Sequence, residues 1–134
     1  MQTEFLFVYG TLMSLFNNSM AQYLRNNSWL INNGYFNGYL FDLGNFPGAV
    51  YNSQVKSKVY GEVYQVNRIE EVLKTLDNYE GVDDPNFNIY KRKIIPVNIN
   101  KKIINATTYV YIKPFASFKK IESGNYSEYL KEKS

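Results

Sequence analysis

Glu80 is the leading candidate for proton transfer in this sequence. It lies in the run LDNYEG, residues 76–81, at the predicted end of a helix. The 134 residues include no histidine and no cysteine, which excludes a cysteine nucleophile, a Ser-His-Asp triad, a histidine-ligated metal and a cysteine-rich zinc site. Proton transfer must therefore fall to a carboxylate, a lysine or a tyrosine.

A second candidate element is the run of Tyr9, Gly10, Thr11 and Leu12, directly after an apolar stretch that predicts a buried strand. Glycine at position 10 permits a sharp change of direction. Such a turn can point successive backbone N–H groups into a concavity that binds a carboxylate or a developing oxyanion, and Thr11 can add a hydroxyl donor. An ordinary turn is the simpler interpretation of these four residues taken alone.

Glu80 taken alone also has a simple structural interpretation. A glutamate at a helix C-terminus is usually solvated, and its charge opposes the helix dipole. The nearby Arg92 lies on a predicted strand with alternating faces, where it can pair with Asp77, Asp83 or Asp84. A structural role is therefore favoured for Arg92.

The elements that must position these residues are mainly strands. Aromatic and β-branched residues between turn signals predict six of them, at residues 5–8, 35–41, 48–51, 58–66, 89–99 and 103–112. The last two are joined around residues 100–102, and Pro96 suggests an edge or a bulge. The sequence predicts one domain, residues 1–134, of α+β class: a mixed, mostly antiparallel small β-barrel with a few short helices.

Three short helices are expected between and after these strands. Ser19 is a plausible cap for a helix over residues 19–25, and another helix covers residues 126–131. The central helix follows Asn67 as its predicted cap, with Glu70 completing a capping box. Its apolar stripe consists of Ile69, Val72, Leu73 and Leu76. Gly81 suits the left-handed residue that ends it.

The charge distribution leaves a nucleic-acid interface as a rival hypothesis. Residues 91–134 hold ten Lys or Arg against three Glu, whereas residues 1–90 hold five against nine acidic residues. Basic strands interleaved with tyrosine can bind single-stranded nucleic acid, but lysines spaced along alternating strands are more often a solvated face. No nucleic-acid partner is expected. The absence of a basic leader and of a bilayer-length apolar segment predicts a cytoplasmic protein without membrane contact.

Eight short fragments, taken in order, resemble the gamma-glutamylcyclotransferase-like superfamily, especially its gamma-glutamylamine cyclotransferase and avirulence-induced-protein-like branch. They are residues 7–12 (FVYGTL), 38–44 (GYLFDLG), 46–48 (FPG), 59–64 (VYGEVY), 76–81 (LDNYEG), 90–92 (YKR), 109–111 (YVY) and 123–126 (SGNY). The resemblance covers almost the whole chain. It depends on the ordered set of fragments rather than on any one of them.

The resemblance implies an enzyme that cyclises a γ-glutamyl amine or peptide to 5-oxoproline and releases the amine. It implies no cofactor and no metal. Glu80 matches the general acid/base of such enzymes, and Tyr9, Gly10, Thr11 and Leu12 match the loop that binds the small-molecule γ-glutamyl substrate. The chain departs from the family after Leu12, where a basic residue and a glycine are frequent and this sequence has MSLF. The alternative is a non-catalytic domain of the same fold that binds a small metabolite or a protein.

Overall fold

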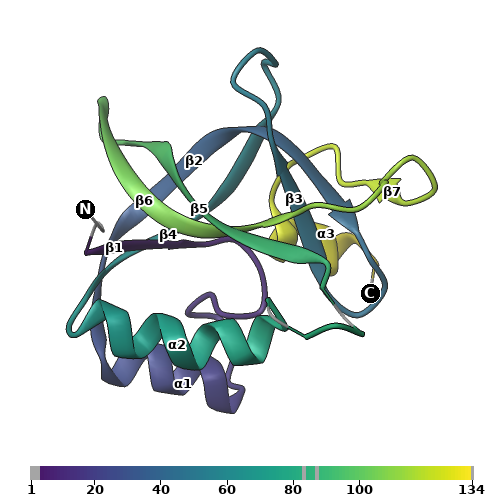
Figure 1. Ribbon diagram of the computed structural model, residues 1–134. Coiled ribbons are helices and arrows are strands. Elements are labelled where there is room, and N and C mark those ends of the chain that lie inside the picture. Colours follow the sequence, from purple (N-terminus) through teal and green to yellow (C-terminus); the bar gives the residue numbers. More distant parts are fainter. Residues whose placement is uncertain (1–3, 83, 87, 134) are drawn as a thin grey trace.

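Five strands form a closed barrel in the computed structural model, which describes residues 4–82, 84–86 and 88–133 (Figure 1). They are β1 (Phe5–Val8), β2 (Ser28–Asp42), β4 (Lys58–Val66), β5 (Tyr90–Ile99) and β6 (Lys102–Tyr111). Their order is β2-β4-β1-β6-β5, and the pair Tyr35–Asn98 closes the barrel between β2 and β5. β1 runs parallel to β6 and the other pairs are antiparallel, so the predicted fold class is confirmed.

Two further strands pair with the part of β2 that continues beyond the barrel. β3 (Pro47–Tyr51) and the two-residue β7 (Lys119–Lys120) both pair with the C-terminal part of β2. The N-terminal part of β2 pairs with β4 instead, with an irregularity between Leu30 and Asn32. The sequence had predicted only residues 35–41 of this strand and no strand at β7. β2 is thus the long element shared between the barrel and the outer sheet.

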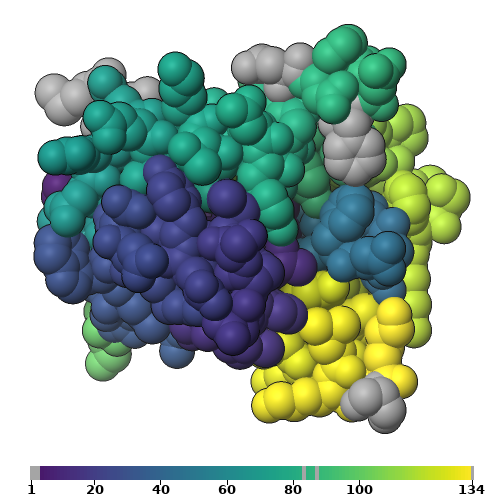
Figure 2. Space-filling view, turned by 90° about the horizontal axis from the view of Figure 1, so that it is seen from below, coloured from purple at the N-terminus to yellow at the C-terminus, as the bar shows by residue number. Residues whose placement is uncertain are grey.

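The three helices are α1 (Ser19–Asn26), α2 (Ile69–Glu80) and α3 (Tyr126–Lys133). α1 and α2 lie together beneath the barrel, and α3 lies near β3 (Figure 1). Seen from below, α1 and α2 cover much of the face, and α3 adjoins the segment that follows β1 (Figure 2). The rings of Phe16 and Tyr126 lie 6.1 Å apart at this junction. The helices therefore flank the loop that follows β1, at residues 9–12.

The barrel interior and the inner face of α2 share one apolar core. Leu6, Phe7 and Val8 of β1 are buried, as the continuous apolar run predicts for a strand with neighbours on both sides. Val72, Leu73 and Leu76 are also buried, which confirms most of the predicted stripe on α2. Ile69 packs against the core while partly exposed. The core holds the C-terminal end of α2 against the barrel.

The predicted helix caps need correction at two of three places. Arg68, not Asn67, precedes α2, in a left-handed conformation without a side-chain cap bond. The Asn67 N–H, which a capping box would direct to Glu70, donates instead to the Asn27 carbonyl. Asn18, not Ser19, caps α1, since its side chain accepts from the Ala21 N–H at 2.8 Å. Gly81 ends α2 with a φ of 71°, as predicted.

Candidate active site

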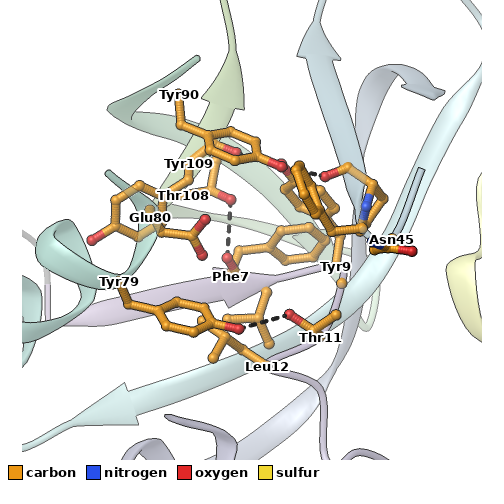
Figure 3. Close-up of a pocket in the computed structure, with 14 residues that line it drawn as sticks. Phe7, Tyr9, Thr11, Leu12, Asn45, Tyr79, Glu80, Tyr90, Thr108 and Tyr109 are labelled. Atoms are coloured by element: carbon orange, nitrogen blue, oxygen red, sulfur yellow. Dashed lines mark hydrogen bonds between the residues drawn. The ribbon is translucent and has the colours of Figure 1, made fainter. Parts of the chain in front are cut away.

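A cavity of about 290 Å³ opens between the barrel and the C-terminal end of α2 (Figure 3). Four parts of the chain line it: the end of β1 with the loop after it, the turn before β3, the end of α2, and facing positions on β5 and β6. The lining residues are 7–12, 45–47, 79–80, 90 and 108–109. Most are apolar or aromatic, with a few polar groups, which is typical of a small-molecule site.

Glu80 projects its carboxylate into this cavity from the last position of α2 (Figure 3). The left-handed turn at Gly81 ends the helix directly behind it. Among the described lining residues Glu80 is the only carboxylate. Burial in these surroundings raises its pKa from 4.5 to about 7, because the charged form loses hydration. A carboxyl group with this pKa can accept and return a proton near neutral pH.

Three tyrosines form the inner wall and keep their hydroxyl protons. The hydroxyl of Tyr9 donates to the Tyr109 carbonyl at 2.6 Å, that of Tyr90 donates to the Pro47 carbonyl at 2.5 Å, and that of Tyr109 donates to Asp77 at 2.6 Å. Burial raises the pKa of each phenol above its ordinary value, and the negative charge of Glu80 raises all three further. They are neutral groups that shape the cavity, which leaves Glu80 as its titrating group near pH 7.

The loop at residues 9–12 faces the same cavity from the other side. The Met13 N–H donates to the Gly10 carbonyl at 3.1 Å and closes a tight turn. A side chain at Gly10 would place its Cβ 2.8 Å from Cγ of Pro47, so only glycine fits this close approach. Leu12 is buried, and Tyr9, Gly10, Thr11 and Leu12 all line the cavity with Glu80. Their roles as catalytic and binding residues stay predictions.

A polar contact joins the loop at residues 9–12 to the end of α2 across the cavity. Oγ1 of Thr11 lies 3.4 Å from the hydroxyl of Tyr79, the residue before Glu80 on α2 (Figure 3). Asn18 then holds the Thr11 carbonyl through its Nδ2 at 2.7 Å, while its Oδ1 caps α1. The loop is thus tied to both helices that lie beneath the barrel.

Arg92 pairs with Asp77, one of its three predicted partners. The distance from Nη1 of Arg92 to Oδ2 of Asp77 is 3.0 Å, and the other carboxylate oxygen accepts from Tyr109. Asp83, another predicted partner, lies outside the described residues. Arg92 is not among the described residues that line the cavity. The pair fastens α2 to β5 and β6 one helical turn before Glu80.

Comparison with known proteins identifies the family. Residues 6–128 match the family described as "Gamma-glutamyl cyclotransferase, AIG2-like". The chain belongs to this family. The resemblance proposed from the eight sequence fragments is therefore confirmed. No curated protein sequence matches the chain.

Solved structures share the γ-glutamyl cyclotransferase-like fold. Bacillus subtilis YkqA is 28% identical with a TM-score of 0.73; the match covers 98% of this chain but 43% of YkqA, so this chain spans less than half of that protein. Escherichia coli YtfP is 31% identical with a TM-score of 0.60, covering 90% of this chain and 94% of YtfP. An AIG2-like protein from Mus musculus is 22% identical, covers 92% and 88% of the two chains, and supports the fold alone with a TM-score of 0.69.

Several residues that line this cavity were not predicted from the sequence. Asn45, Tyr79, Tyr90, Thr108 and Tyr109 line it but were not predicted as site residues. Tyr79 adjoins Glu80 in sequence, and the two strand tyrosines lie in fragments that carried the resemblance. These three tyrosines could therefore have been predicted as site residues from the sequence. Thr108 and Asn45 had no distinguishing sequence context, because a strand threonine and a turn asparagine are common.

The rival nucleic-acid hypothesis depended on tyrosines in the basic final third. Stacking of bases requires exposed ring faces. The tyrosines of this part of the chain are instead buried; they are Tyr90, Tyr109, Tyr111, Tyr126 and Tyr129.

None of the helices in the described part of the chain is long and apolar enough to cross a membrane.

Proposed function

We propose that this protein is a γ-glutamyl cyclotransferase in which Glu80 is the general acid/base. The observation that carries the proposal is the position of the Glu80 carboxylate, which faces a small cavity opposite the loop at residues 9–12. Membership of the γ-glutamyl cyclotransferase family supports the same reaction class. The substrate is a γ-glutamyl amine or peptide, and the reaction uses no cofactor.

In the first step, Glu80 removes a proton from the substrate's α-ammonium group. A free α-amine is mostly protonated at neutral pH and is then a poor nucleophile. A base with a pKa near 7 can take up this proton and still be about half ionised near neutral pH. The pKa raised by burial therefore suits the step better than that of an exposed glutamate.

In the second step, the free amine attacks the γ-carbonyl carbon of the same molecule. Because nucleophile and carbonyl are already joined, the protein needs mainly to hold the folded-back conformer. The new C–N bond closes a five-membered ring and places a negative charge on the carbonyl oxygen. We assign the stabilisation of this oxyanion to the N–H groups of residues 9–12.

In the third step, protonated Glu80 returns its proton to the leaving nitrogen. The bond from the γ-carbon to that nitrogen breaks, and Glu80, now ionised, carries the second proton of the ring nitrogen to the departing amine. The products are 5-oxoproline and a protonated amine. The proton balance closes, since two protons leave the α-ammonium, two reach the amine, and Glu80 ends ionised as it began. Neither water nor a redox partner is consumed.

The decisive experiment measures 5-oxoproline after incubation with a panel of γ-glutamyl amines, γ-glutamyl amino acids and γ-glutamyl peptides. We expect release from at least one class, and a loss of about 100-fold to 10,000-fold in Glu80→Gln, which keeps the shape but not the basicity. Circular dichroism of the variant checks that it is folded. Absence of product across the panel, or near-normal release by folded Glu80→Gln, would contradict the proposal.

A further inference from the structure

We propose that Glu62 is a positioning residue that clamps both ends of the loop at residues 9–13. The inference rests on the proposed function, in which this loop binds the γ-glutamyl group. Glu62 belongs to β4 and lines a groove on the outer side of the loop, separate from the cavity that holds Glu80. It therefore acts on the substrate only through the loop.

The side chain of Glu62 holds the end of the loop at Ser14. Its Oε1 accepts from the Ser14 N–H at 2.7 Å, and its Oε2 accepts from the Ser14 hydroxyl at 2.6 Å. The Tyr64 hydroxyl donates to Oε1 at 3.1 Å and restrains the carboxylate from the same strand. Hydrogen bonds to an ionised carboxylate are about twice as strong as neutral ones, so this is a firm attachment.

The main chain of Glu62 lies opposite the start of the loop. In the antiparallel pairing of β1 with β4, Val8 lies directly opposite Glu62. Val8 is the last residue of β1, and the loop begins at the next residue. One residue of β4 thus faces the loop's start through its backbone and binds its end through its carboxylate. The intervening five residues must close within that fixed span.

The span matters because the loop has little other freedom to adjust. Leu12 and Met13 are buried, and the turn from Gly10 to Met13 is closed by its own hydrogen bond. A displacement of the Ser14 end therefore shifts the residues that face the cavity. A misplacement of about 1 Å at a binding site can cost about 100-fold in rate.

Ser14 directly follows the loop, as the second residue of the MSLF segment at residues 13–16. The contact to its N–H does not depend on the residue type, whereas the contact to its hydroxyl does. The geometry therefore assigns two parts to the clamp. Glu62→Ala removes both parts, and Ser14→Ala removes only the hydroxyl contact.

The test compares Glu62→Ala, Ser14→Ala and a matched control, Glu71→Ala, which removes an exposed glutamate on α2. We expect kcat/KM for the best γ-glutamyl substrate to fall about 10-fold to 100-fold in Glu62→Ala, through both KM and kcat because the loop binds the substrate and stabilises the oxyanion, and to fall less in Ser14→Ala. Glu62→Gln, which keeps an acceptor for the Ser14 N–H, should restore part of the affinity. Glu71→Ala should match the wild type.

Amide hydrogen exchange provides a readout that does not require activity. In Glu62→Ala we expect faster exchange at residues 10–14, with unchanged exchange at residues 72–76 of the buried face of α2. Unchanged exchange and kcat/KM, or exchange that rises equally in both segments, would overturn the clamp. A wild-type protein that forms no 5-oxoproline would defeat the proposed function, while the exchange data would still decide whether Glu62 orders the loop.

Discussion

Asp77 and Glu80 are two carboxylates one turn apart on the same helix, in opposite electrostatic situations. Asp77 accepts from Arg92 with one oxygen and from Tyr109 with the other. Within the described chain, no residue donates a hydrogen bond to the Glu80 carboxylate, which faces the cavity and has its pKa raised to about 7 by burial. Partners stabilise the ionised form of a carboxylate, whereas burial without them favours the neutral form.

One helix thus carries both a paired acid that fastens it to the barrel and an acid that faces the cavity. The pair of Asp77 with Arg92 and Tyr109 ties α2 to β5 and β6, which holds the end of the helix in place. Glu80 then occupies a fixed position although no described residue forms a hydrogen bond or an ion pair with its carboxylate. A functional carboxylate needs such support from neighbours that do not bind it directly.

The largest expected contrast is in turnover. Glu80→Gln should lower kcat by about 100-fold to 10,000-fold, because the base is lost. Asp77→Asn should lower it by about tenfold or less, because this change weakens a hydrogen bond outside the cavity. Steady-state kinetics of both amide variants with the same substrate measure the ratio. Equal losses would show that the two carboxylates act together.

The next contrast is in the pH dependence of stability. The pKa of Glu80 is about 7 in the folded protein against 4.5 ordinarily, so between these values the folded state holds a proton that the unfolded chain has released. The free energy of unfolding therefore falls as pH rises through this window, by at most about 3 kcal/mol. The contribution is complete below about pH 4.5 and lost above about pH 7.

Urea denaturation of wild type and Glu80→Gln between pH 4.5 and 8 tests this linkage. The variant should lack the decline, so the two curves should diverge with rising pH. The kcat/KM of the wild type should rise over the same window, since the base acts in its ionised form. Parallel stability curves would mean that Glu80 is solvated and ordinary.

Removal of the paired carboxylate should destabilise the fold directly. Asp77→Ala leaves the buried Tyr109 hydroxyl and Arg92 without their acceptor, at a cost of roughly 1–3 kcal/mol in the free energy of unfolding. Asn78→Ala, at the neighbouring exposed position, is the control and should change stability by less than about 0.5 kcal/mol. Denaturant titration measures both. A similarly small effect for Asp77→Ala would show that the contacts of Asp77 with Arg92 and Tyr109 do not stabilise the fold.

The smallest effect is expected at Arg92. Its side chain is 33% exposed, so the ion pair with Asp77 is partly screened by solvent. Arg92→Gln should cost about 1 kcal/mol or less, and the difference should shrink at high salt. Thermal denaturation at low and high salt measures this. A large, salt-independent loss would place more of the helix attachment on Arg92 than its exposure suggests.

Much of the barrel was predictable from local patterns. β1 and β4 have the predicted bounds, β3 and β5 differ from theirs by one residue at one end, and β6 is shifted by one residue at both ends, because their hydrophobic runs are bounded by turn signals. The start of β2 was missed, since the polar segment NNG at residues 32–34 reads as a loop although it pairs with β4. β7 is two residues long and exists only through its pairing with β2.

The cap at Asn67 shows the same limit within a helix. The capping box is a local signal, and residues 67 and 70 satisfy it. The Asn67 N–H nevertheless bonds to the Asn27 carbonyl at the end of α1, which is distant in sequence. Tertiary contacts override local preferences of this size, which are about 1 kcal/mol.

The sequence by itself determined which chemistry was available and which residues were candidates. The absence of histidine and cysteine left proton transfer to other groups, and the glycines at positions 10 and 81 marked a turn and a helix end. Only the tertiary structure decided that the segments next to these two glycines, which are 71 positions apart, line one cavity. The tertiary structure also decided that Asp77 pairs with Arg92 while the Glu80 carboxylate faces the cavity. The reason is physical: a pKa and a binding site depend on burial and neighbours, and these exist only after the barrel closes.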